Sequence, residues 1–274
     1  AIAEEIGNRR GVATSLGNIG MAYDNLGQYE KAIEHHTRSL AIQEEIGNRQ
    51  GVASILGNLG IAYNSLGQYD KAIDHLTRSL TIAEELGDRQ GVASSLGNLG
   101  SAYNSLGQFD KAIDHHTRSL AIREEIGDRR GVAYSLGNLG NAYRNLGQYE
   151  KTIDHLTRSL AIAEEIGNRR GVATSLGNIG MAYDNLGQYE KAIEHHTRSL
   201  AIQEEIGNRQ GVASILGNLG IAYNSLGQYD KAIDHLTRSL TIAEELGDRQ
   251  GVASSLCNLG NAYDRLGQYE KAID

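Results

Sequence analysis

The chain contains no proline and no tryptophan, and only one phenylalanine and one cysteine among its 274 residues. Aromatic residues amount to 5% of the sequence and are almost all tyrosine. A single large globular core normally contains more large side chains than this, whereas thin helical layers can pack on small residues. The composition therefore favours a helical repeat architecture over one compact core.

Other absences restrict the partners and the setting of the protein. Cys257 is the only thiol and cannot form a disulfide within the chain, which indicates a reducing compartment and predicts a cytoplasmic location. We find no signal-peptide pattern and no apolar run long enough to span a bilayer, so we expect no membrane partner. The net charge of −8 argues against nucleic acid, because phosphate binding requires a basic surface.

The sequence does contain a repeat with a period of 40 residues. Its most regular block reads Gly-Val-Ala-x-Ser/Ile-Leu-Gly-Asn-Leu/Ile-Gly, and in the last copy Cys257 replaces the second glycine. Residues 1–96 are also identical to residues 161–256, as either recent duplication or deliberate concatenation would produce. Fixed-period self-similarity predicts one repeat array over residues 1–274. We divide it into full repeats at 11–50, 51–90, 91–130, 131–170, 171–210 and 211–250, with partial repeats at 1–10 and 251–274.

Each repeat is predicted to contain two amphipathic helices. The apolar positions of the first helix, over residues 11–25, recur at spacings of four, three and four: Val12, Leu16, Ile19 and Tyr23. The second helix, over residues 29–46, has a similar face: Ala32, Ile33, His36, Ser39, Leu40 and Ile46. Gly27 and Gly47 are predicted to end the two helices, because glycine adopts positive φ readily. No strand-like alternation occurs, so the expected fold class is all-α.

These positions resemble the signature of the tetratricopeptide repeat (TPR) family in every complete repeat: Leu16, Ile19, Gly20, Tyr23, Gly27, Tyr29, Ala32 and Ser39. Two departures are that Leu16 stands where many TPRs have tryptophan, and that the second helix is six residues longer and lacks the usual proline. This 40-residue form is most similar to LGN/Pins scaffolds, kinesin light chains and TPR arrays of bacterial signalling proteins. The resemblance implies a right-handed superhelical solenoid that binds extended peptides in its concave groove.

One asparagine per repeat lies in the middle of the first predicted helix. A side-chain amide offers a donor and an acceptor, which match one peptide unit, and asparagine is only a mediocre helix former. We therefore interpret these residues either as contacts to a peptide backbone, which the resemblance implies, or as bonds to a neighbouring helix that fix the stacking. We call them the ladder asparagines: Asn18, Asn58, Asn98, Asn138, Asn178, Asn218 and Asn258. Gly17 precedes the first of them and either leaves room for a ligand backbone or permits tight helix packing.

Two further positions of the first helix vary between repeats and lie three residues apart, on the same face as the ladder asparagines. We interpret them as selecting ligand side chains, with tolerated surface variation as the alternative. The first variable position is occupied by Met21, Ile61, Ser101, Asn141, Met181 and Ile221. The second variable position is occupied by Asp24, Asn64, Asn104, Arg144, Asp184 and Asn224.

The remaining polar patterns are interpreted as structural. His35 and His36 are adjacent, so their side chains diverge by about 100° on a helix, whereas a helical zinc pair needs a spacing of three or four. Glu44, Glu45 and Arg49 fit a solvated helix face. In a less favoured interpretation, Arg10, Arg130 and Arg170 lie at the groove mouth and attract acidic peptides. Every candidate catalytic group recurs many times, so we expect no cofactor, no metal and no enzymatic activity.

The sequence thus predicts a scaffold that binds a protein or peptide partner. Its alternative is a structural module that stacks end to end into filaments, because terminal repeats normally present a polar outer face. Here the two ends carry Ile2, Ile6, Leu256 and Leu259 instead. A head-to-tail contact between two such apolar ends would not close on itself and would therefore generate fibres.

Overall fold

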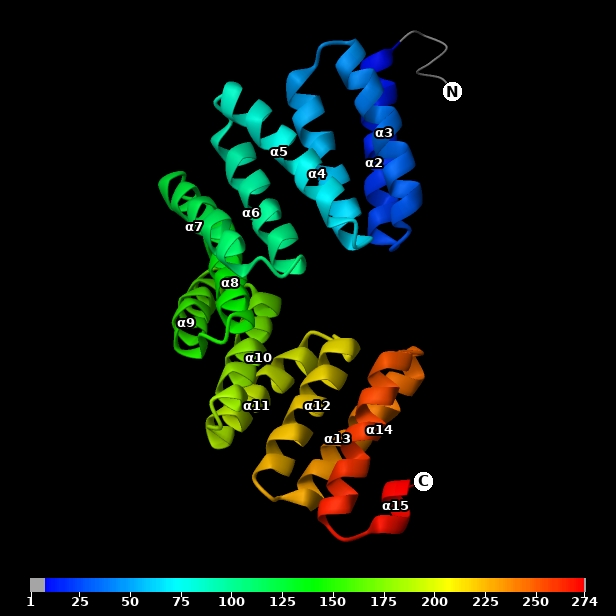
Figure 1. Cartoon of the computed structure of the whole chain (residues 1–274), viewed down its shortest axis with the longest axis vertical. Helices are drawn as coiled ribbons and strands as arrows, with labels where there is room; N and C mark the ends of the chain where they lie inside the picture. The colour runs from blue at the N-terminus through cyan, green and yellow to red at the C-terminus, as the bar shows by residue number, and fades with distance from the viewer. Residues whose placement is uncertain (1–7, 274) are drawn as a thin grey trace. The chain divides into compact units, whose positions relative to one another are not determined.

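The computed structural model describes residues 8–273, so the expectations for Ile2 and Ile6 lie outside the described residues. Within that range the chain forms fourteen α-helices and no strand, and the all-α prediction is confirmed. Neighbouring helices run in opposite directions and are joined by short turns (Figure 1). The helices are α2 (Arg9–Asn25), α3 (Tyr29–Glu45), α4 (Arg49–Ser65), α5 (Tyr69–Glu85), α6 (Arg89–Ser105), α7 (Phe109–Glu125), α8 (Arg129–Asn145), α9 (Tyr149–Glu165), α10 (Arg169–Asn185), α11 (Tyr189–Glu205), α12 (Arg209–Ser225), α13 (Tyr229–Leu246), α14 (Arg249–Arg265) and α15 (Tyr269–Ile273).

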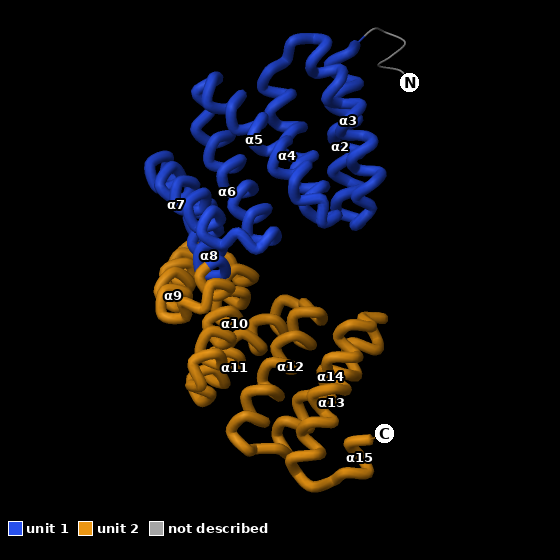
Figure 2. Tube along the Cα trace, viewed as in Figure 1, with its two compact units in different colours: residues 1–142 blue, residues 143–274 orange. Residues whose placement is uncertain are grey.

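The chain divides into two compact units, residues 1–142 and residues 143–274 (Figure 2). Each unit consists of consecutive helix pairs of the kind that the repeat predicts. One continuous array over residues 1–274 and its superhelical handedness stay predictions.

The first helix of each repeat begins two residues earlier than predicted, so Arg9 and Arg10 belong to α2 and not to the end of a preceding helix. The cause is an N-cap. The Asn8 side-chain oxygen accepts a hydrogen bond from the Gly11 N–H at 2.9 Å, which satisfies one of the unpaired donors of the first turn. Asp88 caps α6 in the same way. Gly27 and Gly47 adopt φ of +69° and +68°, as their role in ending the helices requires.

The core consists of small clusters between neighbouring helices. One cluster joins α3 to α4 and contains Leu40, Val52, Ile55, Leu56 and Leu59. A second joins α11 to α12 and repeats the same five side chains 160 residues later: Leu200, Val212, Ile215, Leu216 and Leu219. Each helix pair therefore buries its apolar face against the next pair, as expected for a repeat array.

Leu259 corrects one expectation about the C-terminal end. It was predicted to contribute to an apolar outer face, but it is only 8% exposed, because it packs against Ala232 and Leu236 of α13. Leu256 is 51% exposed, as predicted. The apolar surface at α14 is therefore smaller than the sequence suggested.

Close packing within each repeat explains one of its glycines. A Cβ placed on Gly20 would lie 2.5 Å from the ring of His36, which is fully buried. The prediction that Gly20 serves close helix packing is confirmed. Ser39 fastens the same helix pair, because its hydroxyl donates to the Ala13 carbonyl at 2.7 Å.

Candidate functional site

The ladder asparagines lie one per first helix, on α2, α4, α6, α8, α10, α12 and α14. Asn18 is exposed and the other six are half-buried. Across residues 8–273 none of their side chains forms a hydrogen bond to a neighbouring helix, and the Asn138 amide nitrogen is buried without a partner. The structure therefore gives no support to the interpretation that these amides fix the stacking of helices. Apart from that buried nitrogen, their donors and acceptors are left for water or a ligand.

A cavity of about 400 Å³ lies between α12 and α14 in the second unit. Asn218 and Ile221 line it from α12, and Asn258 lines it from α14. The floor is formed by Ser239 and Ala243 of α13. A ladder asparagine from each of two consecutive repeats thus borders one cavity.

A second cavity, of about 600 Å³, involves helices α8 to α12 of the same unit. Its walls include the variable positions Arg144, Met181 and Asp184, and it shares Asn218 and Ile221 with the first cavity. Tyr149 and Tyr189 also line it. In the second unit the variable positions Arg144, Met181 and Asp184 consequently border the same cavity as the ladder asparagine Asn218.

The first variable position is partly apolar and accessible. Met21, Ile61 and Ile221 are 44%, 45% and 43% exposed. Met181, Ser101 and Asn141 are half-buried. Exposed apolar side chains spaced one repeat apart suit contact with ligand side chains, although single exposed apolar residues are common on protein surfaces.

At the second variable position, two aspartates are committed to a partner within their own repeat. Asp24 Oδ2 lies 2.9 Å from His36 Nε2, and Asp184 has the same contact with His196. Both histidines are fully buried. Asn64, Asn104 and Asn224 are half-buried. Sequence reasoning missed the Asp–His pairing. The available signal was that the repeat with Asp24 carries His36, whereas the next repeat carries Asn64 and Leu76 at the same two positions.

The adjacent histidines do diverge, as predicted. His35 stacks on the Tyr23 ring with centroids 5.3 Å apart, whereas His36 points into the core. In the third repeat Asn104 stands where Asp24 would be, and burial lowers the pKa of His116 from 6.5 to about 4. No group of three or more potential metal ligands occurs within residues 8–273.

Gly17 and its counterparts differ in what surrounds them. A Cβ on Gly17 would lie 3.0 Å from Ile55 Cδ1, so this glycine permits tight packing against the next first helix. A Cβ on Gly217 would meet only the Ser239 hydroxyl, at 3.6 Å, and Gly217 lines the cavity between α12 and α14.

The charged positions at the helix ends separate into two groups. Arg49 pairs with Glu85 and Arg9 pairs with Glu45, and all four side chains are about half-exposed, as expected of a solvated face. Such pairs contribute little stability. Gln210 and Gln250 line the cavity between α12 and α14. They occupy the repeat position of Arg130, and the placement of that position at a groove mouth stays a prediction.

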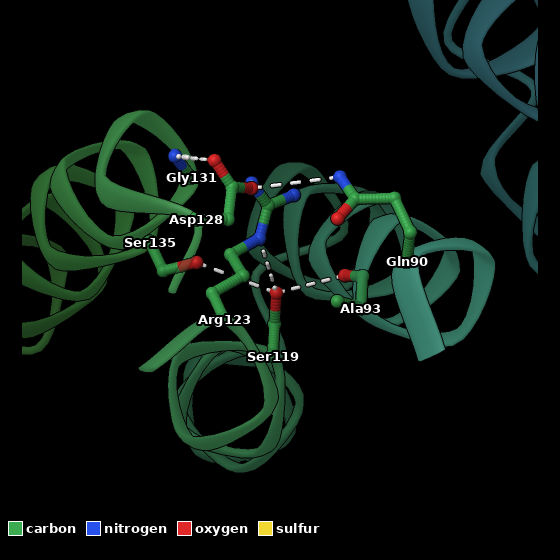
Figure 3. Close-up of polar contacts among 7 residues, drawn as sticks. All are labelled: Gln90, Ala93, Ser119, Arg123, Asp128, Gly131 and Ser135. Atoms are coloured by element: carbon green, nitrogen blue, oxygen red, sulfur yellow. Dashed lines mark hydrogen bonds and ion pairs between the residues drawn. The ribbon is translucent and has the colours of Figure 1, made fainter. Parts of the chain in front are cut away.

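Sequence reasoning did not single out Arg123, which is only 9% exposed. Its Nε donates to the Ser119 hydroxyl and its Nη1 donates to Asp128 Oδ2, both at 3.2 Å (Figure 3). Its guanidinium lies 5.8 Å from the Tyr134 ring centroid. The other Asp128 oxygen accepts the Gly131 N–H and caps α8 (Figure 3). The only available signal was that this position holds glutamine or alanine in the other repeats.

Comparison with known families settles what kind of repeat this is. The tetratricopeptide repeat model matches residues 1–45, 51–125, 131–205 and 211–274. The chain belongs to the tetratricopeptide repeat family. TPR chains are protein–protein interaction scaffolds, and this chain has that architecture. No helix within residues 8–273 has both the length and the apolar character of a membrane span.

Solved structures show the same TPR fold at low sequence identity. BtubC from P. vanneervenii is 21% identical, with a TM-score of 0.71 over 80% of this chain and 92% of that chain. Aspartyl phosphate phosphatase F from Bacillus subtilis is 16% identical, with a TM-score of 0.79 over 99% of this chain and 70% of that chain. A Rap protein complexed with competence and sporulation factor is 17% identical, with a TM-score of 0.67 over 93% and 75%. No curated protein sequence matches the chain.

Proposed function

We propose that this TPR chain is a scaffold that binds an extended peptide along its first helices, with the ladder asparagines holding the peptide backbone. The observation that carries the proposal is the position of Asn218. Its amide forms no hydrogen bond within the described residues, and it borders both cavities of the second unit. An amide so placed can donate to a peptide carbonyl and accept from a peptide N–H.

The variable positions supply the selectivity in this proposal. Ile221 borders both cavities and offers an apolar contact, whereas Arg144 and Asp184 offer charge in the larger one. Side chains of different chemistry along one face let the scaffold distinguish peptides that the asparagines would hold equally. The fold that this chain shares with a Rap protein complexed with competence and sporulation factor is compatible with a bound partner.

The test is a double substitution, Asn218→Ala with Asn258→Ala. The probe is a pool of 12-residue random peptides with amidated C-termini, and binding is measured by fluorescence anisotropy. We expect affinity to fall by about 1–3 kcal/mol for each peptide group left unpaired, with helicity unchanged. The control, Thr197→Ala with Thr237→Ala, alters exposed residues of the second helices and should bind normally. Normal peptide binding by the asparagine variant, together with earlier unfolding, would show that the amides are structural.

End-to-end assembly is the second candidate. It is favoured by a cavity of about 480 Å³ between α14 and α15 that is lined by Leu256, Cys257 and Ile273. We expect sedimentation velocity to show concentration-dependent growth that Leu256→Glu suppresses. A single species of monomer mass at every concentration would eliminate this candidate.

A further inference from the structure

Arg144 is unlike its counterparts in the other repeats. It occupies the second variable position, where every other repeat carries an uncharged or acidic side chain: Asp24, Asn64, Asn104, Asp184, Asn224 and Asp264. Since α2, α4, α6, α10, α12 and α14 form without arginine at this position, the helical packing does not require it.

The surroundings of Arg144 give its charge little compensation. The side chain is half-buried, and its Nη1 lies 3.4 Å from Met181 Sδ, which is a weak acceptor. Within residues 8–273 no carboxylate forms an ion pair with it, and Asp184 in the same cavity is bonded to His196. Burial lowers the pKa of Arg144, because removal of water disfavours the charged form. The group nevertheless stays protonated, as arginine does in proteins.

Arg123 shows how this fold accommodates an arginine that serves packing. Its guanidinium is held by Asp128 and Ser119 and lies over Tyr134. A buried charge without such partners costs free energy, so charged groups in protein interiors are normally paired. Arg144 lacks the carboxylate that Arg123 has, and it borders a cavity of about 600 Å³ that can admit one.

We propose that Arg144, together with Tyr149 and Tyr189 of the same cavity, forms a subsite for one carboxylate group of the bound peptide. The inference rests on the proposed function and names the chemistry that one part of the site selects. A guanidinium presents two parallel N–H donors that match the two oxygens of a carboxylate. The tyrosines line the same cavity and offer hydroxyl donors. The carboxylate can belong to an acidic side chain or to the C-terminus of the peptide.

Three fluorescent pools of 12-residue peptides distinguish these sources. The first has a fixed central glutamate and an amidated C-terminus, the second has glutamine in place of that glutamate, and the third has no acidic residue and a free C-terminus. We expect the full chain to bind either the first or the third pool about tenfold more tightly than the second, at low salt.

Two variants assign the preference to Arg144. Arg144→Asn installs the residue found at the equivalent position of α4, α6 and α12, which carry Asn64, Asn104 and Asn224. The variant should therefore keep the thermal unfolding profile of the parent chain. It should bind all three pools with the affinity that the parent has for the glutamine pool. Arg144→Lys keeps the positive charge but lacks the two parallel N–H donors of the guanidinium, so it should retain part of the preference for the carboxylate-containing pool.

Equal binding of all three pools by the parent chain, or a preference that persists in Arg144→Asn, overturns the inference and leaves the proposed function intact. If no pool binds, the proposed function fails. The subsite is then judged by titration with N-acetylglutamate α-amide, followed through the Arg144 Nε–H signal by NMR. A signal that does not move overturns the subsite as well.

Discussion

The gap between α6 and α8 in the first unit and the gap between α12 and α14 in the second unit are related by 120 residues, yet different side chains lie at their floors. In the second unit Ala243 forms the floor, and Gly217 and Gly251 line a cavity of about 400 Å³. In the first unit Arg123 replaces that alanine. A Cβ on Gly131 would collide with its Nη1, and a Cβ on Gly97 would lie 3.8 Å from its Nη2, so the guanidinium lies between the equivalent glycines.

The comparison indicates that the second-helix residue at this position, Arg123 or Ala243, influences how much of the space between consecutive first helices is filled. In the α2–α4 gap Gln43 occupies the floor position and accepts a hydrogen bond from the Asn48 amide at 2.8 Å. The repeat backbone is thus a constant frame, and the floor residue sets the chemistry of each gap.

Acidification should separate the two regions most strongly. His116 in the first unit corresponds to Leu236 in the second, and burial, with smaller contributions from His115 and Arg123, lowers the pKa of His116 to about 4. Between pH 6.5 and 4 the unfolded chain takes up a proton that folded His116 does not, so stability falls as the pH falls through that window. The loss approaches on the order of 3 kcal/mol at its lower end.

The measurement is urea unfolding of the parent chain and of His116→Leu at pH 7 and pH 4.5. Leu76, Leu156 and Leu236 show that leucine fits this position. The variant should lose less stability on acidification than the parent, and an identical loss in both would contradict the role of His116.

The Arg123→Ala substitution should convert the filled gap into an open one. We expect the first unit to lose about 1–3 kcal/mol, because an ion pair, a hydroxyl contact and the aromatic contact with Tyr134 disappear together. Ala83 and Ala163 show that the backbone accepts alanine there. Hydrogen exchange of the α6 and α8 amides measures the change locally, and unchanged protection would mean that the arginine contributes nothing to the junction.

The reverse change, Ala243→Arg with Ser254→Tyr, should fill the open gap with a smaller effect. Asp248 already caps α14 and stands where Asp128 stands in the first unit. We expect a gain of about 0.5–1.5 kcal/mol from the new charge-assisted contacts. Differential scanning calorimetry reports the gain, and Ala243→Arg alone, which lacks the tyrosine, serves as its control. A lower unfolding temperature in the double variant would show that the α12–α14 gap cannot accommodate the side chains that the α6–α8 gap contains.

The helices, their turns and the family could be predicted because the information is local and repeated. The period, the apolar spacing and Gly27 each recur in every repeat. The helix starts were wrong by two residues because Asn48 was assigned to the end of one helix, whereas its side chain caps the next. The contacts of Asp24 and Arg123 depend on side chains that meet across turns or between helices, which spacing along one helix does not show.

The duplicated core clusters also affect how the chain can fold. Because the α3–α4 and α11–α12 clusters are built from the same five side chains, α4 fits the face of α11 as well as it fits that of α3. Specific pairing then depends on chain connectivity, since loop-closure entropy favours the partner that is nearer in sequence. At high concentration the same degeneracy lets a helix pair of one molecule close on another molecule, which makes the identical segments a route to domain-swapped, kinetically trapped states.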